Sequence, residues 1–219
     1  MLQIPSEFWL DQPNTPFPEI DLALKDPNGL IAIGGELSTE RLLDAYSKGI
    51  FPWYSEGEPI LWYSPDPRMV ITPESFHSSK SMLKVIRSGR FEVRKNTNFD
   101  QVINLCRNVV RTNQSGTWID DSMVNAYCVL HHKGYAHSYE VYEKGELVGG
   151  LYGVALGEVF FGESMFSLAN NASKIAFSGL LQSGAYKLID CQVENEHLRS
   201  LGAMNISRDL FVKQLKAFV

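Results

Sequence analysis

The sequence has few of the features that mark secreted, metal-binding or membrane-spanning proteins. Its 219 residues include only three cysteines, Cys106, Cys128 and Cys191, and no CxxC pair. An odd, scattered set of this kind supports neither a disulfide framework nor a zinc site, and it indicates a reducing compartment. No apolar run approaches the roughly 18 to 20 residues of a membrane-spanning helix. Because the N-terminus has no basic stretch followed by an apolar core, we expect no signal peptide and a cytoplasmic protein without a membrane partner.

Motifs for phosphate or metal binding are also absent from the sequence. It has no Walker loop and no HExxH pattern. The histidines His77, His131, His132 and His137 are scattered without ligand spacing, and His197 is interpreted as a structural residue. We therefore expect neither a metal nor a cofactor.

Basic residues are concentrated in one short segment, although the net charge is −5. Residues 80–95 have six Lys or Arg against one Glu, whereas residues 1–79 have four against twelve Asp or Glu. Lys80, Lys84 and Arg87 fall at i, i+4 and i+7, which is one face of a helix. This stripe is either a solvated helix face or a surface that binds a phosphate backbone through charge and counterion release.

The character of the sequence changes near residue 67. The first part is rich in proline, and four Trp and Tyr residues fall between residues 53 and 63. So dense a cluster is either the core of a small domain or a stacking platform for a base. We predict a small N-terminal aromatic and proline-rich domain, 1–67, and a second domain, 68–219.

Hydrophobic periodicity predicts an α/β (α+β) fold in which a mixed sheet is flanked by helices. FPWYSEG and ILWYSPDPR are expected to pair as a hairpin, and MVITP and FEVRKN are expected to be strands. AHSYEVYE, ELVGGLYGVAL and EVFFGES are expected to form three successive strands, and KLIDCQ a further one. Helices are expected over residues 38–48, 78–87, 99–110, 122–132, 172–183 and 208–218.

The most informative stretch extends from GEVFFGES to KLIDCQ. An apolar run ends at Gly162, and the carboxylate of Glu163 follows at an expected turn. In KLIDCQ, strand alternation places Asp190 and Gln192 on one face and Cys191 on the other. The pair fits a reaction centre or, alternatively, a buried pair at a strand end. Glu163 fits a binding carboxylate or a charge at a helix N-terminus.

An ordered set of motifs resembles the bacterial leucyl/phenylalanyl-tRNA–protein transferases. The motifs are GLIAIGGEL, GIFPWYSEG, LWYSPDPR, TWI, AHSYEVY, ELVGGLYG, FGESMFS, NASK, LIDCQ and NEHLRSLGA, and they cover most of residues 29–208 in the family's order. A single motif such as NASK means little, but the ordered set is highly specific. The resemblance implies a small N-terminal domain joined to a catalytic domain similar to GNAT-type acetyltransferases.

The resemblance also implies an activity and its partners. Family enzymes transfer Leu, Phe or, less well, Met from aminoacyl-tRNA to proteins that begin with Arg or Lys, which marks those proteins for N-end rule degradation. The reaction is aminolysis of an ester that is already activated, so it requires no ATP, metal or redox cofactor. The enzyme has to supply positioning, a proton acceptor and stabilisation of the oxyanion.

Carried over position by position, the resemblance implies a role for individual residues. Asp190 and Gln192, joined by Asn195, are expected beside the incoming amine. Asp190 either orients the Gln192 amide or receives charge, and the amide contacts the amine or the carbonyl. Glu163 is expected to bind the acceptor's Arg or Lys side chain. Residues that periodicity alone places in the core are expected to form the pocket for the transferred side chain: Leu151, Met165, Phe177, Leu180 and Ile189. The tRNA's terminal adenosine is expected beside Tyr46, Trp53, Trp118 and Tyr127, and its body along Lys80, Lys84, Arg87 and Arg90.

Two other functions compete with this interpretation. An acyl-CoA transferase of the GNAT type needs a glycine-rich pyrophosphate loop, where this chain has ESMFSLANNASK. A non-catalytic adaptor for basic N-termini would use Glu163 and the pocket, but it has no reason to combine Trp53, Trp118 and the basic stripe.

Overall fold

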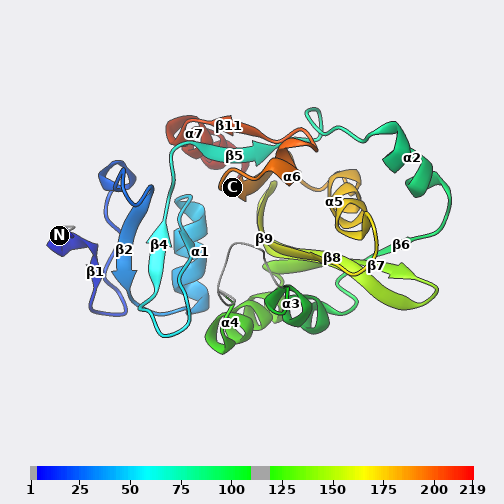
Figure 1. The fold of residues 1–219 in the computed structure, drawn as a ribbon. Helices are drawn as coiled ribbons and strands as arrows, with labels where there is room; N and C mark the ends of the chain where they lie inside the picture. Colours follow the sequence, from blue (N-terminus) through cyan, green and yellow to red (C-terminus); the bar gives the residue numbers. More distant parts are fainter. Residues whose placement is uncertain (1–3, 110–118) are drawn as a thin grey trace.

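The chain forms a small N-terminal sheet beside a larger mixed sheet, as seen in the computed structural model, which describes residues 4–109 and 119–219 (Figure 1). In the small sheet the strand order is β1-β2-β4-β3, with β1 and β2 parallel and the other neighbours antiparallel. β3 and β4 contain the two aromatic segments, so the predicted hairpin is confirmed. The elements of this part are η1 (Ser6–Phe8), β1 (Trp9–Leu10), η2 (Ile20–Leu22), β2 (Leu30–Gly34), α1 (Thr39–Ser47), β3 (Phe51–Pro52) and β4 (Leu61–Tyr63).

Helix α1 begins and ends where its capping residues predict. The Ser38 side chain accepts a hydrogen bond from the Arg41 amide at 3.2 Å, which satisfies a free N–H of the first turn. Gly49 follows the helix with φ of 76°, a left-handed conformation that glycine adopts without steric cost. The buried face of α1 includes Tyr46, whose side chain points toward the larger sheet and contacts Phe161.

The larger sheet has the strand order β11-β5-β10-β9-β8-β7-β6. β9 and β10 are parallel, and every other neighbouring pair is antiparallel. The predicted meander is therefore confirmed as β7, β8 and β9, and KLIDCQ is confirmed as β10. The strands are β5 (Arg68–Ile71), β6 (Glu92–Lys95), β7 (Ala136–Glu143), β8 (Glu146–Leu156), β9 (Val159–Ser167), β10 (Leu188–Gln192) and β11 (Met204–Ile206).

Helices cover both faces of this sheet (Figure 1). α5 lies on one face against β7, β8 and β9, while α3 and α4 lie on the other. α5 approaches β8 closely at Gly149, because a Cβ there would lie 2.5 Å from the Cβ of Ala172. The helices are α2 (Lys80–Arg87), α3 (Phe99–Arg107), α4 (Asp121–His132), α5 (Ala172–Gln182), α6 (Glu196–Arg199) and α7 (Arg208–Phe218).

The mixed α/β class, the flanking helices and the small N-terminal sheet are confirmed. The sheets change between β4 and β5, close to the predicted boundary. One hydrophobic core nevertheless contains residues of both parts, among them Trp62, Phe161 and Phe211. The division into domains 1–67 and 68–219 therefore stays a prediction. Among the described residues no helix has the length and apolar character needed to cross a membrane.

Candidate active site

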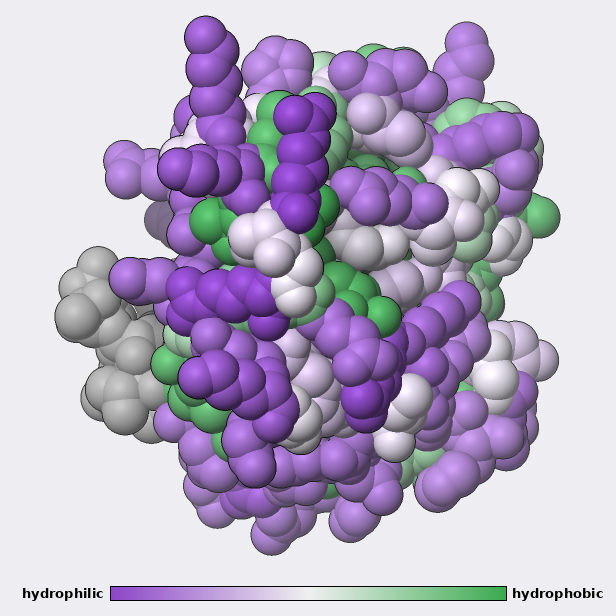
Figure 2. Space-filling model, turned by 90° about the vertical axis from the view of Figure 1, so that its right-hand side faces the viewer, coloured by the Kyte–Doolittle hydropathy of each residue, from purple (hydrophilic) through white to green (hydrophobic). Residues whose placement is uncertain are grey.

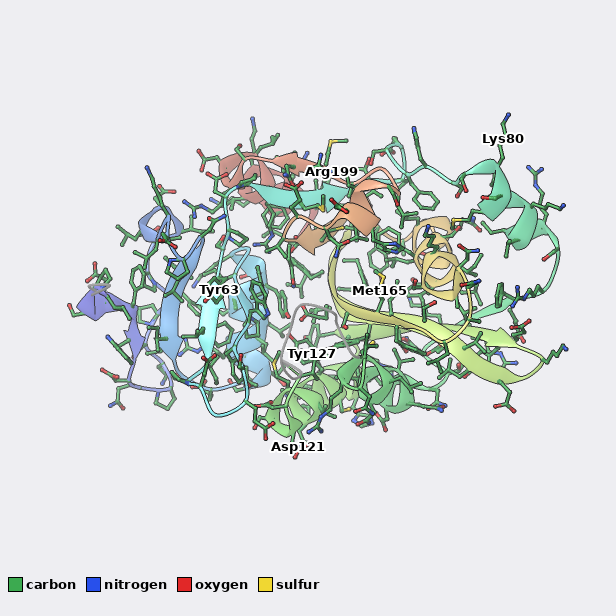
Figure 3. All side chains as sticks on the ribbon, viewed as in Figure 1. Tyr63, Lys80, Asp121, Tyr127, Met165 and Arg199 are labelled. Carbon is green, nitrogen blue, oxygen red and sulfur yellow. The ribbon has the colours of Figure 1, made fainter. Side chains whose placement is uncertain are left out.

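A cavity of about 290 Å³ lies between β3 of the small sheet and β8, β9, β10, α5 and α6. Residues that the sequence predicted for four different roles line it together. Figure 3 shows Met165 between the sheet and α5, and Tyr127 rising from α4 toward the centre of the molecule. The predicted residues that line the cavity are Trp53, Leu151, Glu163, Met165, Phe177, Leu180, Ile189, Asp190, Gln192 and Asn195.

The Asp190 carboxylate is paired with the Arg68 guanidinium in the protein interior. Arg68 Nε donates to Asp190 Oδ1 at 2.8 Å and Arg68 Nη2 donates to Oδ2 at 2.6 Å, and neither side chain has any exposed area. The guanidinium also donates to the Gly49 carbonyl and lies against the rings of Phe51 and Phe211. This two-point contact fixes Asp190 at the end of β10.

The chain leaves β10 through a β-bulge. The register with β5 shifts between Asp190 and Gln192, and Gln192 adopts a left-handed φ of 64°. Its backbone N–H donates to Asp190 Oδ1 at 2.9 Å, which stabilises a conformation that is uncommon outside glycine. Asp190 and Gln192 lie together, as predicted. Cys191 packs against the hydrophobic cluster that contains Ile189, on the other side of the strand from Leu188 and Asp190, so the predicted alternation is confirmed.

Glu163 lies inside β9 rather than at a turn, because the strand continues past it. Its Oε1 accepts hydrogen bonds from the Tyr46 hydroxyl at 2.7 Å and from Gln192 Nε2 at 3.1 Å, and its Oε2 accepts one from the Tyr127 hydroxyl at 3.0 Å. These donors belong to α1, β10 and α4. Since α5 begins only at Ala172, the alternative of a charge at a helix N-terminus is excluded.

Burial dominates the electrostatics of this cluster. It raises the pKa of Glu163 to about 7, with a further rise from Asp190, and the hydrogen bonds from Tyr46, Tyr127 and Gln192 only partly offset it. Burial and the neighbouring Glu163 also raise the pKa of Tyr46 and of Tyr127 well above the ordinary value. Both hydroxyls therefore keep their protons at neutral pH and act as hydrogen-bond donors.

The apolar end of the cavity reaches into the protein core. Its lining residues belong to, or pack against, one hydrophobic cluster on the α5 side of the sheet. The core and pocket interpretations are thus compatible, because the cavity penetrates the core. The predicted residues at this end are Leu151, Met165, Phe177, Leu180 and Ile189.

The aromatic residues predicted around the adenosine are placed differently from one another. Trp53 is half-buried, lines the cavity, and makes an edge contact with Tyr63 at 5.8 Å between ring centroids. Tyr46 and Tyr127 have no exposed area, so in this structure they present hydroxyls to Glu163 and no free ring face. Trp118 lies outside the described residues.

The predicted basic stripe lies on α2, at the end of the molecule farthest from the small sheet (Figures 1 and 3). Lys80, Lys84 and Arg87 are exposed and line a shallow surface hollow, and among the described residues they make no ion pair. Figure 2 looks onto this end, where hydrophilic side chains cover most of the face. Arg90, in contrast, is held by Glu143 through two hydrogen bonds.

Sequence reasoning missed the two roles that shape the end of β10. Arg68 holds Asp190, and the only sign of it is an arginine at the start of an apolar strand within LWYSPDPR. Asn195 caps the short helix α6, since its Oδ1 accepts hydrogen bonds from the amides of His197 and Leu198. Across residues 4–109 and 119–219, no three or more His, Cys, Asp or Glu are grouped so as to hold a metal ion.

Known proteins are similar to this chain over nearly its whole length. The family model described as leucyl/phenylalanyl-tRNA protein transferase matches residues 70–216, and the one for the N-terminal domain of that protein matches residues 35–66. A leucyl/phenylalanyl-tRNA–protein transferase of Pseudomonas putida is 54% identical over 94% of this chain and 92% of its own, and one of Nitrosospira multiformis is 52% identical over 96% and 91%. A solved GCN5-related N-acetyltransferase from Kribbella flavida aligns with a TM-score of 0.39 and 9% identity, over 75% of this chain and 60% of that one. The resemblance predicted from the motifs is confirmed, and the chain belongs to the leucyl/phenylalanyl-tRNA–protein transferase family.

Proposed function

We propose that the cavity holds the aminoacylated 3′ end of a tRNA and the N-terminus of an acceptor protein at the same time. The family makes the chain a tRNA-dependent leucyl/phenylalanyl transferase. Met is a weaker donor in this function, and the acceptor begins with Arg or Lys. The product is degraded by the N-end rule, and the compartment is the cytoplasm. The observation that carries the proposal is that one cavity joins an apolar pocket, an aromatic ring and a carboxylate–amide cluster.

The apolar end of the cavity receives the side chain of the transferred amino acid. A pocket of this shape accepts side chains that are unbranched at Cβ and disfavours the stiff side chains of Val and Ile. Met165 is flexible and adapts to both Leu and Phe. One methylene group discriminates between substrates by only ~1–3 kcal/mol, so a tolerant donor range is expected.

Glu163 receives the cationic side chain of the acceptor. An ionised carboxylate offers about four acceptor positions. Tyr46, Tyr127 and Gln192 fill three of them, which leaves one position on Oε2. A single N–H therefore reaches the carboxylate, and both a guanidinium and an ammonium can supply it, which fits Arg and Lys alike.

The reaction itself is the attack of the acceptor's amine on the ester carbonyl. The C–N bond forms, the C–O bond to the ribose breaks, and the amine's proton passes through solvent or substrate to the departing oxygen. An α-amino group has a reference pKa of about 7.7–8.0, so roughly a quarter of it is already neutral near pH 7.4. Gln192 orients the amine through its side-chain carbonyl. It does not remove the proton, because an amide is too weak a base. Asp190 is a positioning residue, since Arg68 and the Gln192 backbone occupy its carboxylate.

The tRNA contacts the protein at two places in this arrangement. Its terminal adenosine stacks on Trp53 at the edge of the cavity, a contact that contributes roughly 1–3 kcal/mol per base. Tyr46 and Tyr127 support the site through Glu163 rather than by stacking. The body of the tRNA lies along α2, which recognises phosphates and shape rather than an anticodon.

One assay tests this function and the role of Gln192. We expect purified protein to transfer labelled Leu from tRNA to an Arg-initiated peptide without CoA or ATP, and we expect Gln192→Ala to lower turnover at least tenfold while tRNA affinity is kept. Gln182→Ala, at an exposed position on α5, is the matched control and leaves turnover unchanged. Peptide binding without transfer would instead support an adaptor, and transfer that depends on acyl-CoA would support a GNAT-type acyltransferase.

A second prediction concerns the stripe on α2. The double variant Lys80→Gln/Lys84→Gln is expected to weaken tRNA binding and to reduce the slope of log affinity against log salt by about 1.5. Two phosphate contacts are lost, so binding releases fewer counterions. Lys213→Gln/Lys216→Gln removes the same charge from the exposed side of α7 and is expected to have little effect. Equal salt slopes for the two double variants would show that α2 is only a solvated surface.

A further inference from the structure

One polar group of the cavity is left without a partner. His197, the second residue of α6, lines the cavity, and its Nε2 is buried with no hydrogen-bond partner in the described part of the chain. Asn195 fixes the orientation of α6 by capping it. Buried polar atoms are paired in the great majority of cases, so each exception needs an explanation, such as a functional role or a water or ion that supplies the partner.

The surroundings of His197 show which kind of group it can accept. Burial lowers its pKa, and the cation of Lys174 lowers it further, so the imidazole is neutral and Nε2 can accept a hydrogen bond. The adjacent residue, Leu198, belongs to the same hydrophobic cluster as Phe177 and Leu180. His197 therefore lies at the rim of the pocket that receives the donor's side chain in the proposed function.

The geometry of the donor's α-carbon limits which group of the donor can reach His197. With the side chain in the apolar pocket, the ester carbonyl has to face the acceptor's amine near Glu163 and Gln192. The α-amino group, the third heavy substituent of that carbon, is left to point toward another part of the rim. The nearest phosphate of the tRNA lies beyond the ribose, on the far side of the ester from the α-carbon.

We propose that His197 accepts a hydrogen bond from the free α-amino group of the donor amino acid, and thereby selects aminoacyl donors over acyl donors of the same shape. This inference rests on the proposed function. It assigns to His197 a binding role in recognising the donor, in addition to the side-chain pocket and the adenosine contact.

The test compares two donors on the same tRNA, one charged with phenylalanine and one acylated with 3-phenylpropionate, which has the same side chain and no α-amino group. We expect wild-type protein to prefer the phenylalanine donor by about 10- to 100-fold in kcat/KM. His197→Ala is expected to lose most of that preference, and His197→Gln, whose carbonyl can accept the same hydrogen bond, to keep part of it. His132→Ala, an exposed histidine of α4, is the matched control.

A preference that stays at the wild-type value in His197→Ala would overturn the inference, because a purely structural role lowers both donors equally. A third donor with a 2′-deoxy terminal ribose distinguishes the other available hydrogen-bond donor. In wild-type protein the 2′-deoxy donor has a lower kcat/KM if the 2′-hydroxyl is bound. If His197→Ala abolishes this difference and leaves the preference for the α-amino group unchanged, His197 binds the ribose and the assignment to the amine is wrong. Failure of the proposed function is recognised separately, as absence of transfer by wild-type protein from the phenylalanine donor. In that case we compare the affinities of wild-type protein and His197→Ala for a 3′-amide analogue of phenylalanyl-adenosine and for its desamino form. A preference for the amino form that His197→Ala loses supports the inference, and one that it keeps overturns it.

Discussion

Arg68→Ala is expected to lower the free energy of unfolding more than any other single replacement of a charged residue at the site. The substitution leaves the Asp190 carboxylate in a position with no exposed area and without its cation. Removing one partner of a buried ion pair costs roughly 3–5 kcal/mol, because the remaining charge is uncompensated. The loss is a large fraction of the stability of an ordinary domain, about 5–15 kcal/mol. Urea unfolding at pH 7 measures it.

The control for Arg68 is another arginine with a two-point contact to a carboxylate. Arg90 donates to Glu143 through Nε and Nη2, but this pair is at the surface. Exposed pairs contribute little, so we expect Arg90→Ala to unfold close to the wild-type denaturant midpoint. If the two variants unfold at the same midpoint, the pair of Arg68 and Asp190 does not stabilise the end of β10.

The double variant Arg68→Met/Asp190→Leu separates stability from catalysis. Replacing both charges by apolar groups removes the uncompensated charge, and such replacements are often neutral or stabilising. We expect stability to recover while transfer stays low, because the Gln192 backbone amide then has no acceptor to hold its left-handed conformation. Recovery of both properties would mean that the bulge does not depend on Asp190.

The sequence was sufficient for the long periodic elements but not for the bulge at Gln192. Strand and helix periods predicted β7 to β10 and α5, since each of these segments buries a continuous apolar set. A residue with φ of 64° is usually signalled by glycine, yet here a glutamine adopts it. The stabilising contact is made by Asp190, which Arg68 orients from another strand. A contact of this kind depends on tertiary structure and has no local signature.

The surroundings of Glu163 in the candidate site also could not be predicted from the local sequence. Sequence reasoning found the residue but placed it at a turn after Gly162, because FGES has the composition of a strand end. The strand continues, and the carboxylate becomes buried under hydroxyls from α1 and α4. The short elements α6 and β11 were missed as well, since they are too short to show a period. Long periodic segments are predictable, whereas burial and pairing of single polar groups depend on the whole fold.

Glu163→Gln is expected to change both the pH dependence of stability and the use of acceptor peptides. In the unfolded chain the carboxyl group loses its proton near its ordinary pKa of 4.5, while in the folded protein it keeps the proton to about pH 7. Between these values the unfolded state binds fewer protons, so the free energy of unfolding decreases as pH rises through this window. The shift corresponds to roughly 3 kcal/mol. Glu163→Gln removes that decrease and is expected to be more stable than wild type at pH 8, in denaturant unfolding measured from pH 4.5 to 8.

The same substitution is expected to weaken transfer to basic N-termini. A hydrogen bond to a charged group contributes about 1.5–3 kcal/mol, so kcat/KM for an Arg-initiated peptide is expected to fall roughly 10- to 150-fold. In wild-type protein KM for this peptide is expected to decrease as pH rises through about 7, because only the ionised carboxylate of Glu163 attracts the acceptor's cation. Glu163→Gln removes this inflection, while Glu146→Gln, at an exposed position of β8, retains it. An inflection of KM that persists in Glu163→Gln would show that another group recognises the acceptor's side chain, and that Glu163 only holds Tyr46, Tyr127 and Gln192 in place through its hydrogen bonds.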